Sequence, residues 1–333
     1  MTKNKIENEL NDLIYSYRKA QLLYIAAKLQ IADMLLEGPL NHREISKRTG
    51  AHTDTLYRVL KALASFGIFK ENKDKSFEIT SYSRFLTTGH PSKLNKIIIM
   101  RMEEFNWKPW GELLYSVKTG KSSFKKIFGM NLFEYLKKSP DASKIFNESM
   151  DIYSEMDACK IIKSYNFTGF NKIADIGGGY GTLIIKILNK YKKASGILFD
   201  LPNVTREIRE SNKNIKDNSR IKIISGDFFK TIPAGCDLYI LRKIIHDWND
   251  KHSIKILKNC YKAAKRGSRI LLIEQIMDRE DWNKEIRIND IHMLVQTIEG
   301  KERTEEEYRD LLSRAGYKVN TTTANYIEGI KEL

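Results

Sequence analysis

The stretch Ala174-Asp175-Ile176-Gly177-Gly178-Gly179-Tyr180-Gly181 decides the fold of this chain. An apolar lead-in at 172–173 precedes it, and an apolar run over 182–188 follows it directly. This order predicts a strand, a tight glycine turn and a helix. A strand, turn and helix in this order open a nucleotide-type binding unit of an open α/β sheet.

The spacing of the glycines narrows the kind of ligand. Gly177, Gly179 and Gly181 form G-x-G-x-G, whereas dinucleotide enzymes carry G-x-G-x-x-G. No Gly-Lys-Ser/Thr follows, so the turn is not a P-loop. Glycine lets the backbone turn sharply and lets a ligand come closer than a Cβ would allow. The motif indicates a binding turn, although a glycine-rich turn can also be only a turn.

Acidic residues follow two further predicted strands. Asp200 ends the apolar run 196–200, and Asp227 comes just after the run 221–225. The carboxyl ends of parallel strands meet at one edge of a sheet, where ligands bind and where an acid can hold a ribose hydroxyl pair. Any one of these acids, Asp175 included, could simply cap a turn. Together, at the ends of three strands, they favour a ligand site.

These motifs, with Leu-Arg-Lys-Ile-Ile-His-Asp-Trp at 241–248 and Gly-Lys-Glu-Arg-Thr at 300–304, resemble the S-adenosylmethionine-dependent small-molecule O-methyltransferases. That family includes plant caffeic acid and flavonoid enzymes, hydroxyindole O-methyltransferase and bacterial enzymes that tailor natural products. The order and spacing match over about residues 170–317. The resemblance implies an α/β protein: a Rossmann-like class I methyltransferase sheet with an N-terminal helical, winged-helix-like dimerisation domain.

The resemblance also implies where the cofactor S-adenosylmethionine, and its product S-adenosylhomocysteine, would bind. Gly177 is expected near the methionine portion, Asp200 on the ribose hydroxyls, and Asp227 with Phe228 around the adenine. Arg242 falls where plant members place a lysine, which keeps the charge but changes its geometry. The full expected set is Asp175, Gly177, Gly179, Asp200, Asp227, Phe228 and Arg242.

Methyl transfer from a sulfonium to a phenol or enol needs alignment and a base that removes the acceptor proton. Histidine suits this role near neutral pH. His246 follows the predicted fourth strand and matches the family's general base. Glu274 and Glu302 match the acids that flank it, and one of them would orient the imidazole, as in a catalytic triad. The plainer alternatives are a structural histidine and, for Glu302, a surface ion pair or a helix-start acid.

Two further residues match acceptor-binding positions of the family. Asp247 is expected near the acceptor, although it could instead cap the turn at 248–250. Met293 matches a methionine that clamps the acceptor, although it could be ordinary core. The segment 296–299 reads Gln-Thr-Ile-Glu where relatives commonly have Pro-Gly or Gly-Gly, so the acceptor is the part of the site that departs from the family pattern.

The N-terminal part predicts helix, turn, helix and hairpin. Asn41 is expected to cap a helix that Gly50 ends, an amphipathic helix follows over 54–63, and strands at 67–70 and 76–80 form the hairpin. This is a winged-helix pattern, and the family that the chain resembles uses such a unit for dimerisation. The resemblance therefore implies a dimerisation domain at 1–100, followed by a helical acceptor region and methyltransferase domain at 101–333. DNA binding is the rival hypothesis, but the candidate recognition helix offers few donors for base readout.

The composition is ordinary for a globular protein. Of 333 residues, 41% are hydrophobic and 30% charged, and the net charge of +15 comes from scattered lysines. No run of about 18 apolar residues is present, and the mixed-charge N-terminal residues are not expected to be a signal peptide. Three distant cysteines give neither a disulfide framework nor a zinc spacing, so a reducing cytoplasm and no metal are expected. The expected partners are a small-molecule acceptor and a second copy of the chain, with no nucleic acid and no membrane.

Two alternatives within the same fold stay open from the sequence. The chain could keep the cofactor site and methylate nitrogen or carbon. It could also have turned the fold to decarboxylation, hydroxylation or cyclisation, because function resides in the pocket rather than in the fold.

Overall fold

A computed structural model describes residues 3–211, 215, 218–277 and 284–332 of the chain. It divides into two compact units, Met1–Trp107 and Lys108–Leu333. Among the described helices, none combines the length and the apolar character that a membrane crossing requires.

The first unit is a small helical domain with a three-stranded antiparallel sheet in the order β1-β3-β2. Residues from its helices and hairpin share one hydrophobic core, which includes Ile31, Leu60 and Phe77. Its elements are α1 (Lys3–Lys28), α2 (Ile31–Met34), β1 (Leu40–Asn41), α3 (His42–Thr49), α4 (Thr53–Ser65), β2 (Phe69–Glu71), β3 (Ser76–Ile79), α5 (Ser81–Arg84) and α6 (Leu94–Met102).

The local signals predicted for this unit are confirmed. The Asn41 side chain caps α3 by accepting a hydrogen bond from the Arg43 amide at 3.1 Å. Gly50 ends the helix in the left-handed conformation, at φ 68°. Strands β2 and β3 pair antiparallel, with Phe69 opposite Ile79. Helix, turn, helix and hairpin therefore follow in the order that the sequence predicts.

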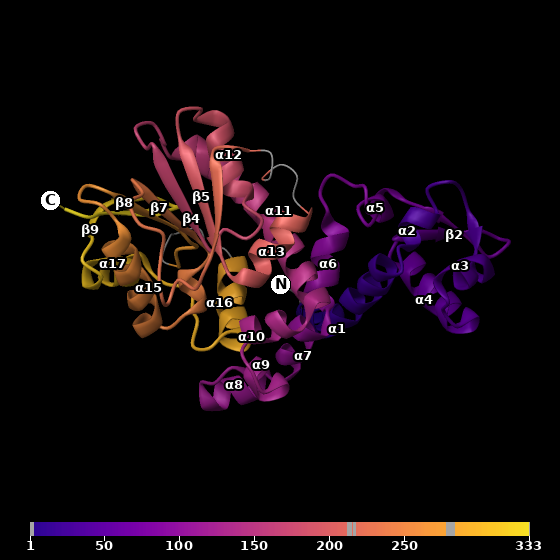
Figure 1. Ribbon diagram of the computed structural model, residues 1–333. Helices are drawn as coiled ribbons and strands as arrows, with labels where there is room; N and C mark the ends of the chain where they lie inside the picture. Colours follow the sequence, from indigo (N-terminus) through magenta and orange to yellow (C-terminus); the bar gives the residue numbers. More distant parts are fainter. Residues whose placement is uncertain (1–2, 212–214, 216–217, 278–283, 333) are drawn as a thin grey trace. The chain divides into compact units, whose positions relative to one another are not determined.

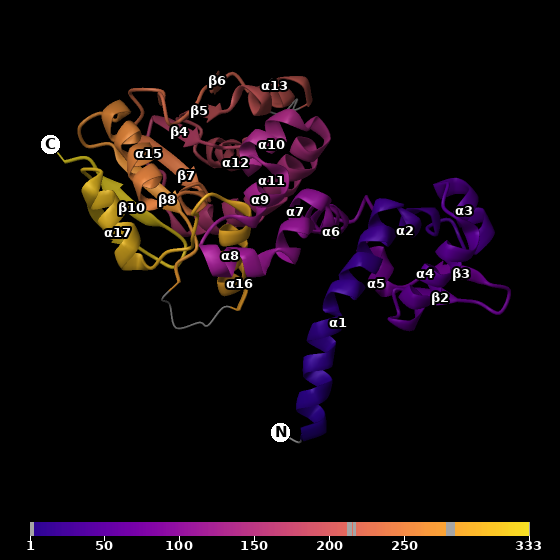
Figure 2. The ribbon, with the colours of Figure 1, turned by 90° about the horizontal axis from the view of Figure 1, so that it is seen from below.

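Helix α1 carries an uncovered apolar stripe. Figure 2 shows its N-terminal half extending away from α2–α5 of the same unit. All residues from 4 to 18 are exposed. The large apolar side chains among them are Ile6, Leu10, Leu13, Ile14, Tyr15 and Tyr17. A contiguous apolar surface of this kind marks an interaction site more often than a solvated helix.

The second unit is built on a seven-stranded sheet in the order β6-β5-β4-β7-β8-β10-β9. Its first five strands in this order pair in parallel, and β10 and β9 run antiparallel at the far edge. The bounds are β4 (Lys172–Ile176), β5 (Ser195–Asp200), β6 (Ile221–Ser225), β7 (Leu238–Arg242), β8 (Arg269–Ile273), β9 (Lys318–Thr322) and β10 (Ile327–Ile330).

Helices cover both faces of this sheet, as Figure 1 shows. On one face, α11 (Pro140–Ser164), α12 (Thr182–Lys190) and α13 (Pro202–Ser211) pack on residues such as Ile173 and Leu198. On the other, α15 (Asp250–Ala263) and α17 (Glu305–Arg314) pack on residues such as Ala174 and Ile176. Burial on both faces explains why the strands read as continuous apolar runs.

The remaining helices are α7 (Glu104–Gly111), α8 (Leu113–Thr119), α9 (Ser123–Phe128), α10 (Leu132–Lys138) and α16 (Lys284–Gln296). Thr304 and Glu307 form a capping box at the start of α17. Helix α15 begins at Asp250 because Asn249 caps it by accepting a hydrogen bond from the His252 amide at 2.9 Å.

Candidate active site

The glycine turn after β4 lies at the carboxyl edge of the sheet. Gly177, Gly179 and Gly181 have φ angles of 68°, 55° and 78°, which only glycine adopts readily. Between them, a Cβ on Gly178 would lie 2.5 Å from Leu198 Cδ1. A Cβ on Gly179 would meet nothing within 4 Å. The turn is therefore packed against the sheet at Gly178 and open at Gly179, as a surface for a ligand requires.

Asp200 ends β5 and lies against this turn. Its Oδ2 accepts a hydrogen bond from the Gly179 amide at 2.8 Å, and its Oδ1 accepts one from its neighbour Leu201 at 2.7 Å. Burial raises the pKa of Asp200 to about 6, although both amide hydrogen bonds favour the charged form. The carboxylate is thus tied to the glycine turn by the backbone.

Asp175 differs from its predicted place. It lies within β4 rather than at the end of the strand, and its side chain is only 1% exposed. Its carboxylate lies beneath the glycine turn, because a Cβ on Gly178 would be 2.6 Å from Asp175 Cγ. Burial raises the pKa of Asp175 to about 7, against the influence of Arg242. Its position supports the glycine turn from below rather than offering a surface to a ligand.

Asp227 and Phe228 follow β6 as predicted and lie beside an aromatic cluster. Asp227 Oδ1 accepts a hydrogen bond from the Phe229 amide at 2.8 Å. The ring of Trp248 makes edge contacts with both Phe228 and Phe229 and stacks on Phe133 of α10, with centroids 5.7 Å apart. The buried Trp248 Nε1 has no hydrogen-bond partner among the described residues. An indole donor in an aromatic wall suits a flat ligand with a polar edge.

Arg242 ends β7 and pairs with a residue that the sequence reading missed. Its Nη1 lies 2.9 Å from the Asp157 carboxylate on α11, and Lys243 Nζ lies 3.7 Å from the same group. On the same helix, Asp151 accepts a hydrogen bond from Thr182, at the start of α12. No local pattern in α11 marks these acids, because their partners come from strands and turns far along the chain.

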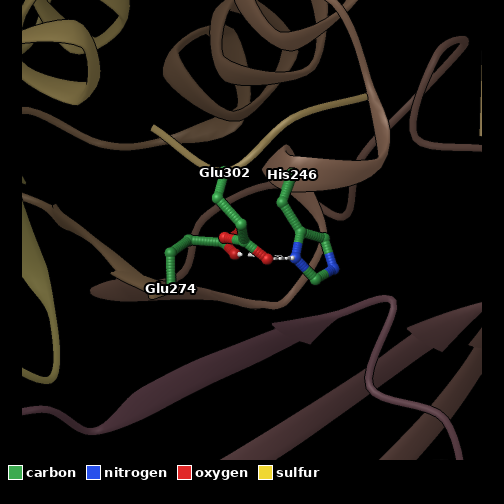
Figure 3. A group of neighbouring side chains, drawn as sticks. All are labelled: His246, Glu274 and Glu302. Atoms are coloured by element: carbon green, nitrogen blue, oxygen red, sulfur yellow. Dashed lines mark hydrogen bonds and ion pairs between the residues drawn. The ribbon is translucent and has the colours of Figure 1, made fainter. Parts of the chain in front are cut away.

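His246 lies in a short 3₁₀ turn, η1 (Ile245–Asp247), that follows β7. The side chain is buried, and its Nδ1 lies 2.9 Å from Glu302 Oε1 (Figure 3). Because a carboxylate only accepts hydrogen bonds, Nδ1 carries the hydrogen and Nε2 is left as the basic nitrogen. The three predicted residues His246, Glu274 and Glu302 therefore come together, although 56 positions separate the first from the last.

Glu274 comes from the end of β8 and holds the histidine turn through its backbone. Its Oε1 accepts hydrogen bonds from the amides of Ile244 at 3.0 Å and Ile245 at 2.8 Å. Its Oε2 lies 3.9 Å from His246 Nδ1. Burial raises the pKa of Glu274 to about 7, although the imidazolium of His246 opposes this. Glu302, closer to the ring, is therefore the principal carboxylate partner of the histidine.

The charges around His246 set its basicity. Burial alone would lower the pKa of the imidazole, but the carboxylates of Glu302, Glu274 and Asp247 outweigh it and raise the pKa to about 9. The pKa of Glu302 moves in the opposite direction, below its ordinary value, because the imidazolium and hydrogen bonds from His246 and Asn289 outweigh its burial.

Asp247 lies on the other side of the imidazole. Its Oδ1 is 3.7 Å from His246 Nε2, the nitrogen that is free to take a proton. Burial raises the pKa of Asp247 to about 6. Asn249, and not Asp247, is the N-cap of α15.

Helix α16 contributes two residues that the sequence reading missed. Asn289 Nδ2 donates a hydrogen bond to Glu302 Oε1 at 2.5 Å, and Asp290 Oδ1 accepts one from the Glu302 amide at 2.9 Å. Met293, one turn further along the same helix, is buried. The neighbouring His292 accepts a hydrogen bond from Trp110 Nε1 at 3.0 Å. Polar residues next to each other in a helix gave no signal that they would face a buried carboxylate.

His246, Glu274 and Glu302 also form a group whose possible metal-ligand atoms lie within 4.8 Å of one another, among the residues described. Nδ1 of the histidine binds Oε1 of Glu302, and Oε1 of Glu274 accepts two backbone amides, whereas the buried Oε2 atoms of Glu274 and Glu302 accept no hydrogen bond from the described residues. The arrangement is that of a histidine oriented by a carboxylate, as in a catalytic triad.

Comparison with known proteins now identifies the family. Residues 110–318 match the O-methyltransferase domain and residues 11–89 its dimerisation domain. The phenazine O-methyltransferase of Lysobacter antibioticus is 36% identical over 93% of this chain and 90% of its own length. The mitomycin biosynthesis 6-O-methyltransferase of Streptomyces lavendulae is 32% identical over 94% of this chain and 89% of its own.

Among solved structures, human N-acetylserotonin methyltransferase in complex with S-adenosylmethionine superposes with a TM-score of 0.88, at 25% identity and full coverage of both chains. The predicted Rossmann-like fold with an N-terminal dimerisation domain is thereby confirmed. This chain belongs to the family of S-adenosylmethionine-dependent O-methyltransferases.

Proposed function

We propose that this enzyme methylates a phenolic or enolic hydroxyl of a planar aromatic small molecule, with His246 as the general base. The observation that carries the proposal is the buried His246–Glu302 pair at 2.9 Å, which leaves Nε2 to take the acceptor proton. When bound, S-adenosylmethionine supplies a methyl group already activated by its positive sulfur.

The raised pKa of His246 suits a phenolic acceptor. A phenol has a pKa near 10. Proton transfer from the phenol to an imidazole of ordinary pKa is therefore unfavourable by about 3.5 pKa units, or about 5 kcal/mol. With its pKa near 9, the gap falls to about one unit, or about 1.4 kcal/mol. Glu302 then stabilises the imidazolium that forms, and Glu274 adds a second negative charge at 3.9 Å.

The residues at the carboxyl edge fit the cofactor. A carboxylate offers about four acceptor positions. The backbone amides use two of those on Asp200, which leaves capacity for the two ribose hydroxyls. The open face of Gly179 permits close approach, and Phe228 with Trp248 provides the aromatic wall for a base. We assign Gly177 to the methionine portion and Arg242, held by Asp157, to the same edge.

We assign the acceptor to the side of the ring where Asp247 and Met293 lie. Asp247 is 3.7 Å from Nε2 and would orient the acceptor hydroxyl toward it. Two relatives are named for phenazine and mitomycin, so we propose a ring-based natural product as the acceptor class.

We further propose that the enzyme works as a homodimer through its N-terminal unit. The match to a dimerisation domain covers residues 11–89, and the apolar stripe of α1 offers a surface that a second copy would bury. Sedimentation of wild type and of a Leu10→Glu/Ile14→Glu variant tests this. A dimer that dissociates in the variant supports the interface, and an unchanged sedimentation coefficient contradicts it.

The experiment that tests the function has two arms. Calorimetric titration with S-adenosylmethionine and S-adenosylhomocysteine should give micromolar binding. Incubation with a panel of hydroxylated phenazines and other aromatics should give products heavier by one methylene, with the methyl on oxygen. Transfer to nitrogen or carbon, or turnover that survives His246→Ala, would favour one of the alternative chemistries.

A DNA-binding role for the N-terminal unit is tested by anisotropy with random duplex DNA. We expect no binding at physiological salt. Strong binding that weakens steeply as salt rises would favour that role.

A further inference from the structure

We propose that Arg303 is a positioning residue for the reaction: its guanidinium joins the turn that carries His246 to the segment that carries Glu302 and so fixes their separation. The inference rests on the proposed role of His246 as base. Arg303 does not touch the imidazole, so it would act through the two backbone segments.

Arg303 is completely buried, with 0% of its surface exposed. Its Nη1 donates to the carbonyl of Ile245 at 3.0 Å, and its Nη2 to the carbonyl of Trp248 at 2.7 Å. Nε and Nη2 both donate to Asp250 Oδ1, at 3.1 and 2.8 Å. A weaker contact at 3.5 Å reaches the carbonyl of Lys301.

These partners are not scattered through the core. Apart from the contact with Lys301, they all lie between residues 245 and 250, the turn whose second residue is His246. Arg303 is itself the chain neighbour of Glu302. One planar group therefore holds the backbone on both sides of the histidine while being bonded covalently to the residue that carries its carboxylate partner.

The two segments are also joined by their backbones. The Lys301 amide donates to the His246 carbonyl at 2.9 Å, and Trp248 forms a parallel bridge with Ile298. Gly300 permits this approach, because a Cβ there would lie 2.5 Å from the His246 carbonyl oxygen. Arg303 adds a fully buried guanidinium to this junction.

The chemistry of arginine explains why this residue serves the junction. A buried charge is costly unless its donors are satisfied, and here one carboxylate and three carbonyls satisfy them. The guanidinium presents its donors in a rigid planar fork, whereas a lysine ammonium is a single flexible point. Lysine at this position would keep the charge but could not hold Ile245 and Trp248 at the same time.

The test compares Arg303→Lys with wild type in the full-length enzyme. We expect kcat to fall at least tenfold while the KM values of cofactor and acceptor change less than threefold. Displacements of about 1 Å in a catalytic group can cost a hundredfold in rate. The pKa of His246, followed by NMR of its ring protons and assigned with His246→Gln, should fall toward the ordinary value because Glu302 would lie further away.

Arg269→Lys is the matched control. Arg269 begins β8 and pairs with the buried carboxylate of Glu328 at 3.2 Å, in contact with none of the proposed site residues. The Arg269→Lys variant should have a lower melting temperature than wild type, with the same pKa of His246 and the same pH profile of kcat. Equal effects of the two substitutions on the pH profile would overturn the proposal.

Asp250→Asn keeps the test decisive if Arg303→Lys does not fold. It removes the charged partner of the guanidinium and leaves both carbonyl hydrogen bonds, so a smaller shift in the same direction is expected. An unchanged pKa of His246 in the variant that folds refutes the positioning role. A shifted pKa with unchanged kcat would instead leave Arg303 as a positioning residue and refute His246 as the base.

Discussion

The carboxyl edge of the sheet holds two regions built in different ways. The proposed cofactor cradle, formed by the glycine turn, Asp200 and the residues after β6, is made largely of backbone: its central carboxylate is held by two amides of nearby loops. The proposed catalytic cluster of His246, Glu274 and Glu302 is made of buried side chains from three separate segments.

The difference predicts how each region fails. A backbone cradle loses affinity when one contact is removed, but the rest of the turn stays in place. A side-chain cluster in a low-dielectric interior is coupled, so one substitution changes the pKa and orientation of its neighbours. Binding and chemistry should therefore separate cleanly between the two regions.

The largest effect is expected from His246→Ala. Loss of a general base typically costs about 10²–10⁴-fold in rate, so kcat should fall in that range. The affinity for S-adenosylhomocysteine should stay within twofold, because the cradle is untouched. Single-turnover product formation and calorimetry measure the two quantities on the same preparation. Residual activity within tenfold of wild type would mean that alignment alone drives the reaction.

Asp200→Ala should show the reverse pattern. Losing hydrogen bonds from a charged acceptor costs about 1.5–3 kcal/mol, which corresponds to about a tenfold to hundredfold loss of cofactor affinity. At saturating cofactor, kcat should change far less.

Asp237→Ala is the matched control for Asp200→Ala. Asp237 Oδ2 also accepts two backbone amides, from Asn171 and Lys172 at 2.9 Å each, but at the opposite end of the strands. It should cost stability and leave affinity unchanged. Equal losses of affinity in the two variants would show that Asp200 acts on the fold and not on the ligand.

The sequence allowed the two regions to be predicted to different depths. The glycine turn and Asp200 follow from local order, because parallel strands deliver their ends to one edge. The family resemblance supplied His246, Glu274 and Glu302, and their meeting in space is found as expected. Asp157, Asn289 and Arg303 were missed as functional residues. Each acts through a partner far away in the sequence, and neither helical periodicity nor spacing encodes such a contact.

Glu302→Gln tests the coupling within the cluster through pH. Only neutral imidazole can accept a proton, so a pKa near 9 makes wild-type kcat rise with pH up to that region. Removing the negative charge at 2.9 Å should lower the apparent pKa by about one unit, so the rise moves to lower pH. The plateau rate should fall about tenfold because imidazolium loses its counter-charge.

Glu274→Gln is the comparison within the same cluster. Its carboxylate is further from Nδ1, at 3.9 Å, so the same shift should be less than half as large. Because the glutamine keeps an oxygen that can accept the two backbone amides, this variant should leave the turn that carries His246 in place and change the melting temperature little. Equal pH shifts in the two variants would mean that Glu274 and Glu302 raise the pKa of His246 by the same amount.

The smallest effect, and the finest test of the cradle, is expected from Gly179→Ala. An alanine at φ 55° costs about 1 kcal/mol of backbone strain, and its Cβ would enter space that is open in the structure. Gly50→Ala has the same strain at φ 68°, also with nothing within 4 Å, but lies at the end of α3 in the N-terminal unit. Both variants should lose similar stability in thermal unfolding. Only Gly179→Ala should also lower the affinity for S-adenosylhomocysteine, by several-fold. Unchanged affinity in that variant would place the ligand away from the open face of the turn, and Asp200 would then hold it from another direction.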